Sequence, residues 1–241
     1  MERFKDSRHV EYLRCESRHI YYLLMLSGGM MGAYTFLMRG GVFCNAQTAN
    51  VLMMAIAFGQ GRWSDGLYYL IPIFAYMLGS FLSEILPVPV QKRSFLRWET
   101  MLIGIEALIL LGIGFIPLTV PDQVVQVLVN FIASMQYNTF RQAEGVPMAT
   151  TFCTNHVRQV GLAAAKAVRQ HSLKSLKRGG RHLAMVFSFL LGCVSVTLLS
   201  GFLGAGTVWL TLVPLGIILV KLIRADLLIA REEREKESGE M

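Results

Sequence analysis

Polar side chains gather inside an apolar stretch that runs from Gly40 to Gly59. Amide and hydroxyl groups in such a stretch either line a polar path or hydrogen-bond neighbouring helices. A second polar group repeats the pattern, because Thr154-Asn155-His156-Val157 has the spacing of Thr48-Ala49-Asn50-Val51. Residue pairs upstream of each motif recur in the same way: Thr35-Phe36 and Gly41-Val42, then Thr139-Phe140 and Gly145-Val146. The chain therefore carries two copies of one polar motif.

The two motifs supply the leading candidates for a binding site. Matching segments of an inverted repeat meet near the middle of a membrane, where their polar groups can hold a solute. His156 and Arg158 make the second motif the more basic one, which favours an anion or a polar neutral molecule. Hydrogen bonding between helices, at about 0.6 kcal/mol per bond, is the alternative role. The expected substrate-binding residues are Thr48, Asn50, Thr154, His156, Asn45, Gln47, Gln136 and Asn138.

Two acidic residues lie in or near apolar stretches. Glu106 sits inside such a stretch, where an ionisable group is costly and marks a functional hypothesis. We expect it either to take up a proton as a coupling acid or to pair with a buried amide. Glu84 lies closer to the end of its stretch, so it is expected to reach water or to pair with Arg93.

The sequence lacks the motifs of familiar enzymes. It has no HExxH, no GxSxG and no Walker phosphate loop, and its five histidines are scattered. The four cysteines, Cys15, Cys44, Cys153 and Cys193, show no CxxC spacing. We therefore expect no catalytic residue, no metal and no cofactor. A membrane-embedded enzyme remains an alternative for which no nucleophile can be named.

The composition indicates a membrane protein. Hydrophobic residues make up 54% of the 241 residues, charged residues only 16%, and the mean hydropathy is +0.48. A soluble domain carries about 25% charged residues, so the composition argues against a soluble enzyme. The first 18 residues have mixed charge, and the apolar stretch after them lacks a cleavage site, which predicts an uncleaved insertion signal.

Apolar stretches long enough, or nearly so, to cross a hydrocarbon core of about 30 Å recur along the chain. We expect membrane spans at Ile20–Met38, Leu67–Leu86, Thr100–Leu118, Gln123–Phe140, Leu183–Leu203 and Gly206–Ile223. If both motif segments also crossed, the basic loop Lys92–Arg97 would lie opposite the basic N-terminal tail, against the positive-inside rule. Six crossings with re-entrant motif segments are therefore favoured, and eight are the alternative.

Three crossings in each half are an odd number, so the second half must be inserted upside down relative to the first. The expected fold is an all-α integral membrane protein of two inverted repeats, each with three transmembrane helices and one re-entrant or broken polar segment. Both termini then face the cytoplasm. The expected parts are a tail at 1–18, a membrane domain at 19–224 with repeats at 19–118 and 122–224, and a charged tail at 225–241.

Several motifs resemble those of a known family. They are Gly32-Ala33-Tyr34-Thr35-Phe36, Gly40-Gly41-Val42-Phe43 and Thr48-Ala49-Asn50 in the first half, and Gln136-Tyr137-Asn138 and Thr150-Thr151-Phe152-Cys153-Thr154-Asn155 in the second. In these the chain resembles the YoaK family of bacterial inner-membrane proteins of unknown function. The resemblance implies six membrane segments and an inner-membrane location, with no established substrate. Gly32 replaces the family's usual acid, and Ala49 and Asn155 replace usual glycines, so a tight turn at Ala49 is expected to be costly.

A basic segment follows the second motif, and no acidic residue occurs between Glu144 and Asp226. On a helix, four of its cations share one face and are expected to bind the anionic membrane leaflet: Arg158, Lys166, Arg169 and Lys177. The competing interpretation of Arg158 is that it begins this cytoplasmic face and never meets a solute. Nucleic-acid binding has no recognisable module to support it. A second copy of the chain, in a homo-oligomer, is a further candidate partner.

Together these patterns predict a small-solute transporter or channel-like permease that binds an anion or a polar neutral molecule between the motifs. The alternative is a non-transporting membrane scaffold or sensor, whose basic cytoplasmic face recruits lipid or a partner protein.

Overall fold

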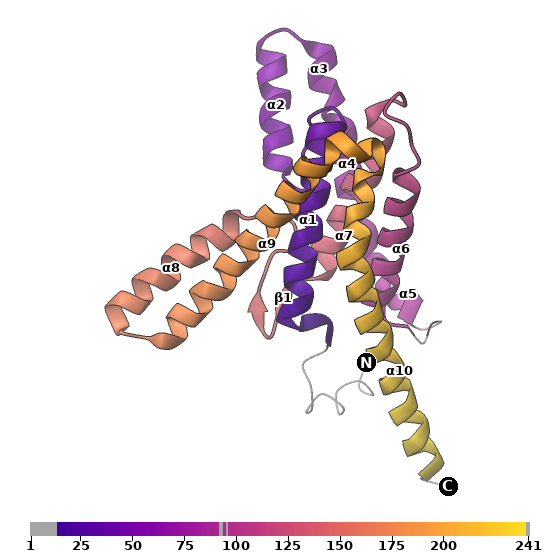
Figure 1. The fold of residues 1–241 in the computed structure, drawn as a ribbon, viewed down its shortest axis with the longest axis vertical. Coiled ribbons are helices and arrows are strands. Elements are labelled where there is room, and N and C mark those ends of the chain that lie inside the picture. Colours follow the sequence, from indigo (N-terminus) through magenta and orange to yellow (C-terminus); the bar gives the residue numbers. More distant parts are fainter. Residues whose placement is uncertain (1–13, 92–93, 95, 240–241) are drawn as a thin grey trace.

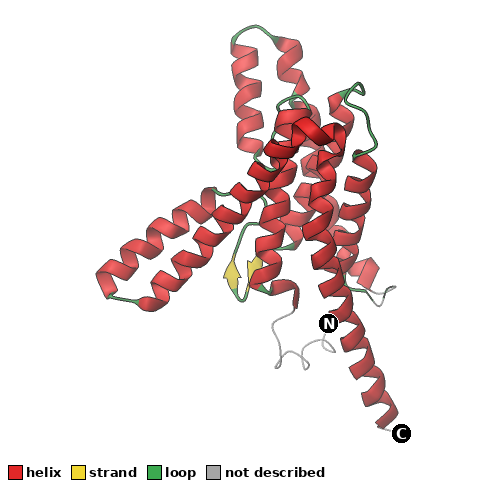
Figure 2. Ribbon diagram, in the orientation of Figure 1, coloured by secondary structure: helices red, strands yellow, loops and turns green. Residues whose placement is uncertain are grey.

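The computed structural model describes residues 14–91, 94 and 96–239, which form an all-α assembly with one short strand pair (Figure 1, Figure 2). The N-terminal half contains η2 (Arg14–Glu16), α1 (Arg18–Met38), α2 (Gln47–Gly59), α3 (Trp63–Tyr68), α4 (Leu70–Ile85), α5 (Pro87–Gln91) and α6 (Trp98–Ile113). The C-terminal half contains α7 (Asp122–Thr139), β1 (Gln142–Ala143), β2 (Val146–Pro147), α8 (Thr154–Gln170), α9 (Leu173–Leu203), η3 (Gly204–Thr211) and α10 (Leu212–Gly239). Most of the expected tail at 1–18 lies outside the described residues.

The helical, membrane-type character predicted from composition is confirmed. Within the described residues, three ranges are long and apolar enough to cross a membrane: Arg18–Met38, Trp63–Ile85 and Leu173–Arg231. The last range contains α9, η3 and α10, and the chain reverses between the two helices, with Gly204 in the left-handed region at φ 53°. The helix α9 begins at Leu173 and not at the expected Leu183, because the basic segment continues into the apolar one without a break.

Within the described residues, the bundle helices pack in three pairs: α1 along α9, α4 along α7, and α6 against α10. Glycine allows the first two crossings. A Cβ atom at Gly29 would overlap the Phe189 carbonyl, and one at Gly192 would overlap the Leu26 carbonyl. A Cβ atom at Gly79 would overlap the Phe131 carbonyl in the same way. Gly29 thus lets α9 approach α1 closely, as small residues do at helix crossings.

Two helical hairpins project from this bundle (Figure 1). In the first, α2 reverses through Gly61, at φ 72°, and packs against α3 and α4. In the second, α8 reverses at His171, at φ 47°, and packs against α9. The Ser172 hydroxyl accepts a hydrogen bond from the Ser175 N–H at 3.3 Å and so caps the start of α9.

Each motif helix follows a turn with left-handed backbone. Gly40 and Gly41 have φ of 74° and 72°, and the matching turn between β1 and β2 has Glu144 at 48° and Gly145 at 72°. Ala49 lies inside α2, where its N–H bonds to the Ala46 carbonyl at 2.9 Å. The expectation of a costly turn at Ala49 is therefore wrong, because the turn falls where glycine relieves the strain.

Candidate functional site

The first motif is organised by Asn50, whose side chain is fully buried. Its Nδ2 atom donates to the Phe43 carbonyl at 2.7 Å, and its Oδ1 atom accepts from the Phe43 N–H at 3.0 Å. The same Nδ2 lies 3.0 Å from Oε1 of Gln47. Asn50 thus fixes the loop before α2 by pairing both backbone polar groups of Phe43.

Gln47 extends this network to α7. Its Nε2 donates to Oδ1 of Asn130 at 2.9 Å, and Nδ2 of Asn130 donates to the Gln126 carbonyl at 2.8 Å. Gln126 in turn donates to the Arg39 carbonyl at 2.7 Å and to the Tyr68 hydroxyl. The unusually polar α7 therefore serves to hold the first motif.

The second motif is organised by His156, which is also fully buried. Its Nε2 lies 2.8 Å from the Ala149 carbonyl, and its Nδ1 lies 2.9 Å from Nδ1 of His182 in α9. A carbonyl only accepts, so Nε2 of His156 carries a hydrogen. Burial lowers the pKa of His156 below its ordinary value, which favours the neutral ring. Nδ1 of His156 then accepts from Nδ1 of His182, and Nε2 of His182 stays buried with no hydrogen-bond partner among the described residues.

The loops that precede the two motif helices meet at Gly28 of α1. Nδ2 of Asn45 donates to the Gly28 carbonyl at 3.2 Å. A Cβ atom at Gly28 would lie 2.8 Å from the Thr150 carbonyl oxygen and 3.2 Å from the Thr151 Cα. The hydroxyls of Thr150 and Thr151 are buried and make no hydrogen bond within the described part of the chain. Buried hydroxyls in native proteins normally have a hydrogen-bond partner, so these two need an explanation.

Glu106 is fully buried in α6, and no ion pair among the described residues includes it. With the Gln136 amide turned so that its nitrogen faces Glu106, Nε2 lies 2.7 Å from Oε1 and 3.3 Å from Oε2. In the opposite orientation, the same nitrogen lies 3.5 Å from the Leu24 carbonyl of α1. In the first orientation the acid pairs with a buried amide and joins α6 to α7 beside α1.

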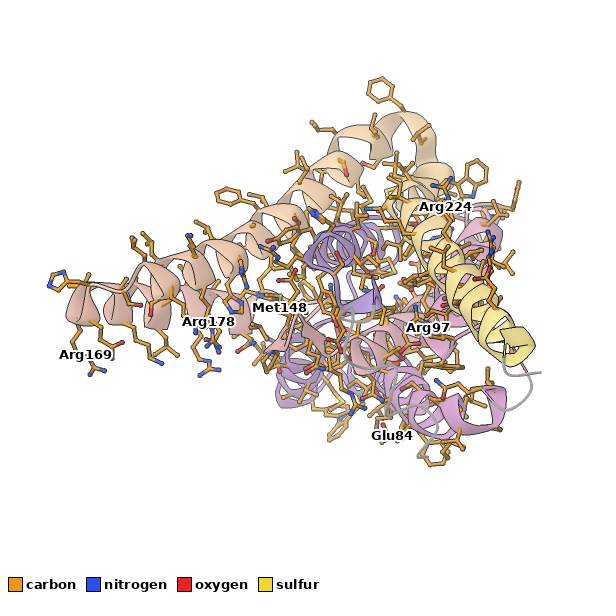
Figure 3. All side chains as sticks on the ribbon, turned by 90° about the horizontal axis from the view of Figure 1, so that it is seen from below. Glu84, Arg97, Met148, Arg169, Arg178 and Arg224 are labelled. Carbon is orange, nitrogen blue, oxygen red and sulfur yellow. The ribbon has the colours of Figure 1, made fainter. Side chains whose placement is uncertain are left out.

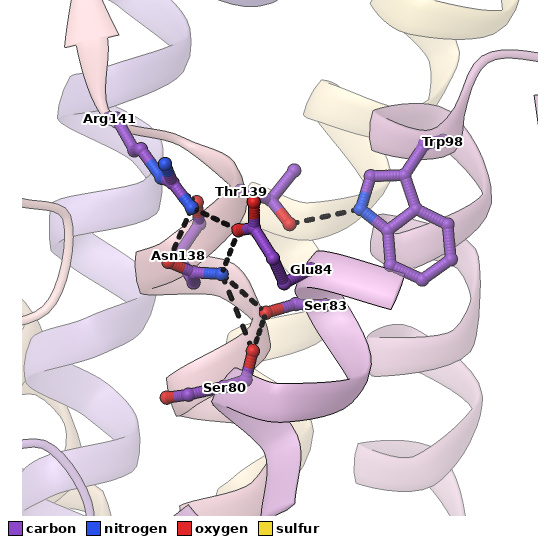
Figure 4. Close-up of polar contacts among 7 residues, drawn as sticks. All are labelled: Ser80, Ser83, Glu84, Trp98, Asn138, Thr139 and Arg141. Atoms are coloured by element: carbon purple, nitrogen blue, oxygen red, sulfur yellow. Dashed lines mark hydrogen bonds and ion pairs between the residues drawn. The ribbon is translucent and has the colours of Figure 1, made fainter. Parts of the chain in front are cut away.

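Asn138 belongs to a separate cluster at the ends of α4 and α7 (Figure 4). Its Nδ2 donates to Oγ of Ser83 at 2.7 Å, and Arg141 binds Oε2 of Glu84 at 2.7 Å. Glu84 therefore pairs with Arg141, and the expected partner, Arg93, lies outside the described residues. A cleft of about 340 Å³ opens beside this cluster, lined by Tyr137, Asn138, Arg141, Pro147, Met148, Ala149, Phe152 and Asn155.

Thr48 and Thr154 point away from these networks. Both side chains are exposed, Thr48 on α2 and Thr154 on α8. The two helices also have different neighbours, since α2 packs on α3 and α4 whereas α8 packs on α9. The structure therefore brings the motif loops together at Gly28, and it does not bring the motif threonines together.

Two buried charged residues were not identified from the sequence. Arg39 is fully buried between Tyr34 and the turn before α7, where its Nη1 donates to the Pro117 carbonyl at 3.1 Å. Asp226 is 3% exposed and accepts from Nε of Arg97 and from the Thr100 hydroxyl, both at 2.6 Å. A lone charge at the end of an apolar stretch was the available signal, but the partners are too distant in sequence to identify.

Nothing in the described residues forms a metal site, because no three histidine, cysteine or acidic side chains gather suitably. The four cysteines are free. Burial raises the pKa of the Cys15 thiol to about 12, and the neighbouring Glu99 carboxylate adds to the rise.

Apolar helices around buried amides and hydroxyls define an all-α protein of the membrane class. The chain belongs to the family described as protein of unknown function (DUF1275), which matches residues 20–221. The resemblance to the YoaK family is thus confirmed as membership of this family of unknown function. No curated protein and no solved structure matches the chain.

Proposed function

We propose that this protein is a small-solute transporter or channel-like permease that binds a polar neutral molecule or a small anion beside Gly28. It would consist of two inverted repeats with six crossings, and would lie in the bacterial inner membrane with both termini in the cytoplasm. It would move its solute without chemical change. The observation that carries the proposal is the meeting of the two motif loops around buried, unsatisfied hydroxyls.

The helix pairing supports the inverted repeats. The first helix of each half packs on the helix that follows the motif in the other half: α1 on α9, and α7 on α4. The third helices, α6 and α10, pack on each other. Gly79 and Gly192, which occupy matching positions in the sequence repeat, each lie at such a crossing. A pseudo-twofold axis produces this reciprocal pattern.

The positions of the loop residues support the binding site. Asn45 and Thr151 each lie three residues before the threonine of their motif, and both contact Gly28. Thr150 and Thr151 offer hydroxyls that both donate and accept, which suits a polar neutral solute or an anion. Arg158 is exposed and donates to Asn155, so it begins the basic face and does not approach Gly28.

Glu106 is suited to couple proton uptake to movement of the repeats. As a carboxylate it accepts from Nε2 of Gln136, and as a carboxylic acid it can donate to Oε1 of the same amide. The turn of the amide would alter the contact of Gln136 with the Leu24 carbonyl of α1. Protonation of Glu106 would thereby change how α6, α7 and α1 fit together.

Flux into liposomes tests the proposal. Purified protein should admit at least one solute from a panel of polar neutral molecules and small anions. The double variant Thr150→Val with Thr151→Val, which keeps the shape and removes the hydroxyls, should lower that flux at least tenfold, whereas Thr48→Val should not. Absence of flux for the whole panel, or equal flux in both variants, would reject the site.

Labelling tests the number of crossings. In a cysteine-free background, single cysteines replace Arg62 and Gln91, and an impermeant reagent is applied to intact cells. Six crossings place residue 62 outside and residue 91 inside, whereas eight crossings reverse both assignments. The absolute side of each residue therefore decides between the two arrangements.

A second candidate function is a scaffold or sensor, and the exposed cations of α8 and α9 favour it. Neutralising these four cations should then abolish the phenotype that the intact protein supports in cells: Lys166, Arg169, Lys174 and Lys177. Changes at Thr150 and Thr151 should leave that phenotype intact. The opposite outcome supports transport.

A further inference from the structure

The hairpin formed by α8 and the first part of α9 is a firmly joined unit. His156 and His182 bond between its two helices, and a Cβ atom at Gly179 would lie 3.0 Å from the Ala163 Cβ. The hairpin extends away from the bundle in Figure 1, so most of its surface meets no other part of the described chain. Its exposed faces therefore need an explanation of their own.

The two broad faces of this hairpin differ in chemistry. At 100° per residue, the faces that pack together are those of His156, Ala163, Gly179 and His182. On one side of that contact lie the cations of both helices: Arg158, Lys166, Arg169, Lys174, Lys177, Arg178 and Arg181. On the other side lie exposed apolar side chains: Val157, Val168, Leu173, Leu176, Leu183 and Phe187. Figure 3 shows Arg169 and Arg178, from different helices, pointing to the same side.

Most of these cations lack an acidic partner. Within the described residues, Arg181 lies 3.9 Å from Glu144, and no ion pair includes Lys166, Arg169, Lys174, Lys177 or Arg178. The apolar face is equally uncovered, since Val168 is 77% exposed and Leu173 is 73% exposed. A partner for this hairpin must offer negative charge and an apolar phase together.

We propose that this hairpin lies in the interface of an anionic lipid bilayer, with its apolar face among the acyl chains and its basic face against the headgroup phosphates. A bilayer supplies both phases next to each other, at the boundary between headgroups and acyl chains. The hairpin is also continuous with the range Leu173–Arg231, one of the three that are long and apolar enough to cross a membrane. Long lysine and arginine side chains reach outward to the phosphates while their stems cover apolar surface.

An environment-sensitive fluorophore tests this placement. It is attached to a single cysteine replacing Val168 in the full chain, purified in neutral detergent, and phosphatidylglycerol or phosphatidylcholine is added in mixed micelles. Phosphatidylglycerol should shift the emission to the blue, and phosphatidylcholine should not. Added salt should reverse the shift, because it screens the headgroup charge.

Two matched double variants test the role of the cations. Lys166→Gln with Arg169→Gln should raise the phosphatidylglycerol concentration at half-maximal shift roughly 25-fold, about fivefold per charge. Lys221→Gln with Arg224→Gln, an exposed pair of the same spacing in α10, should leave it unchanged. Melting temperatures show that both variants are folded.

Three outcomes would overturn the proposal. An equal shift with phosphatidylcholine would show that charge is not recognised. An equal response of the two double variants would show that the recognising charges lie elsewhere. Competition by soluble glycerol phosphate would show that the basic face binds a free phosphate group and not a lipid surface.

Discussion

Asn50 and His156 occupy matching positions in the two motifs, and each bonds to the backbone of the residue seven positions before it. Asn50 holds Phe43, and His156 holds the Ala149 carbonyl. An amide does this in one copy and an imidazole in the other. The shared task is to satisfy backbone polar groups of the non-helical loop that precedes each motif helix. These two residues therefore position the loops that meet at Gly28.

Replacing Asn50 by alanine should destabilise the fold. The change leaves the partly buried Phe43 N–H and carbonyl without their partners, which costs about 1 kcal/mol or more in all. The melting temperature of Asn50→Ala in detergent should fall by several degrees, whereas that of Thr48→Ala, an exposed position on the same helix, should stay the same. Equal melting temperatures for the two variants would show that Asn50 does not brace the loop.

Local pattern was sufficient to predict helical, membrane-type character and to single out Asn50 and His156, which are fully buried. The sequence pattern did not distinguish these two buried residues from Thr48 and Thr154, which are exposed. Residues two positions apart on a helix point about 200° apart, so a buried Asn50 leaves Thr48 exposed. If the start of α2 at Gln47 were known in advance, the exposure of Thr48 could be predicted. Apolar composition alone, however, does not fix where a helix begins after a loop.

Long-range pairs set the other limit. His182 belongs to a basic segment in the sequence, yet in the structure it completes the second motif. Asp226 belongs to a charged tail in the sequence, yet it is buried against Arg97. Each depends on the approach of helices that are distant in the chain, which hydropathy and spacing do not specify.

Alanine at the helix crossings should disturb the packing of the two halves. In Gly192→Ala the new methyl group would overlap the Leu26 carbonyl, and backbone cannot move aside cheaply. We expect a loss of about 1–3 kcal/mol, as for other overpacked cores. Gly112→Ala in α6 is the matched control, because nothing lies within 4 Å of its Cβ position.

The matching glycine of the first half provides a second comparison. Gly79→Ala should lower stability as Gly192→Ala does, since its methyl group would overlap the Phe131 carbonyl. Unfolding in detergent mixtures measures each variant. Tolerance of alanine at both glycines would contradict the close crossings that the two halves share.

The Cys15 thiol should react slowly and with a late pH dependence. Its pKa of about 12 leaves roughly one thiolate in ten thousand at pH 8, and the thiolate is the reactive form. In a single-cysteine chain, the rate with an uncharged thiol reagent should rise tenfold per pH unit through pH 10. A cysteine replacing exposed Ser64 should react about a thousandfold faster at pH 8 and level off above pH 9. A plateau for Cys15 below pH 10 would contradict its burial.

The part of the charged C-terminal segment that ends with Asp226 should be needed for stability. Asp226 accepts the Arg97 N–H at 3.1 Å and its guanidinium at 2.6 Å, and its own side chain is fully buried. Asp226→Ala leaves the partly buried arginine unpaired, so we expect a loss of about 3 kcal/mol. Asp65→Ala, which breaks an ion pair with both side chains 54% exposed, should change the melting temperature little.

Truncation separates the part that Asp226 plays from that of the helix beyond it. A chain ending at Arg224 should be as unstable as Asp226→Ala or more so, whereas a chain ending at Ala230 keeps the pair with Arg97 and should melt close to the full chain. If both truncated chains melted at the temperature of the full chain, the buried pair would have no part in stability. If both melted early, the exposed end of α10 would be the element that stabilises the bundle.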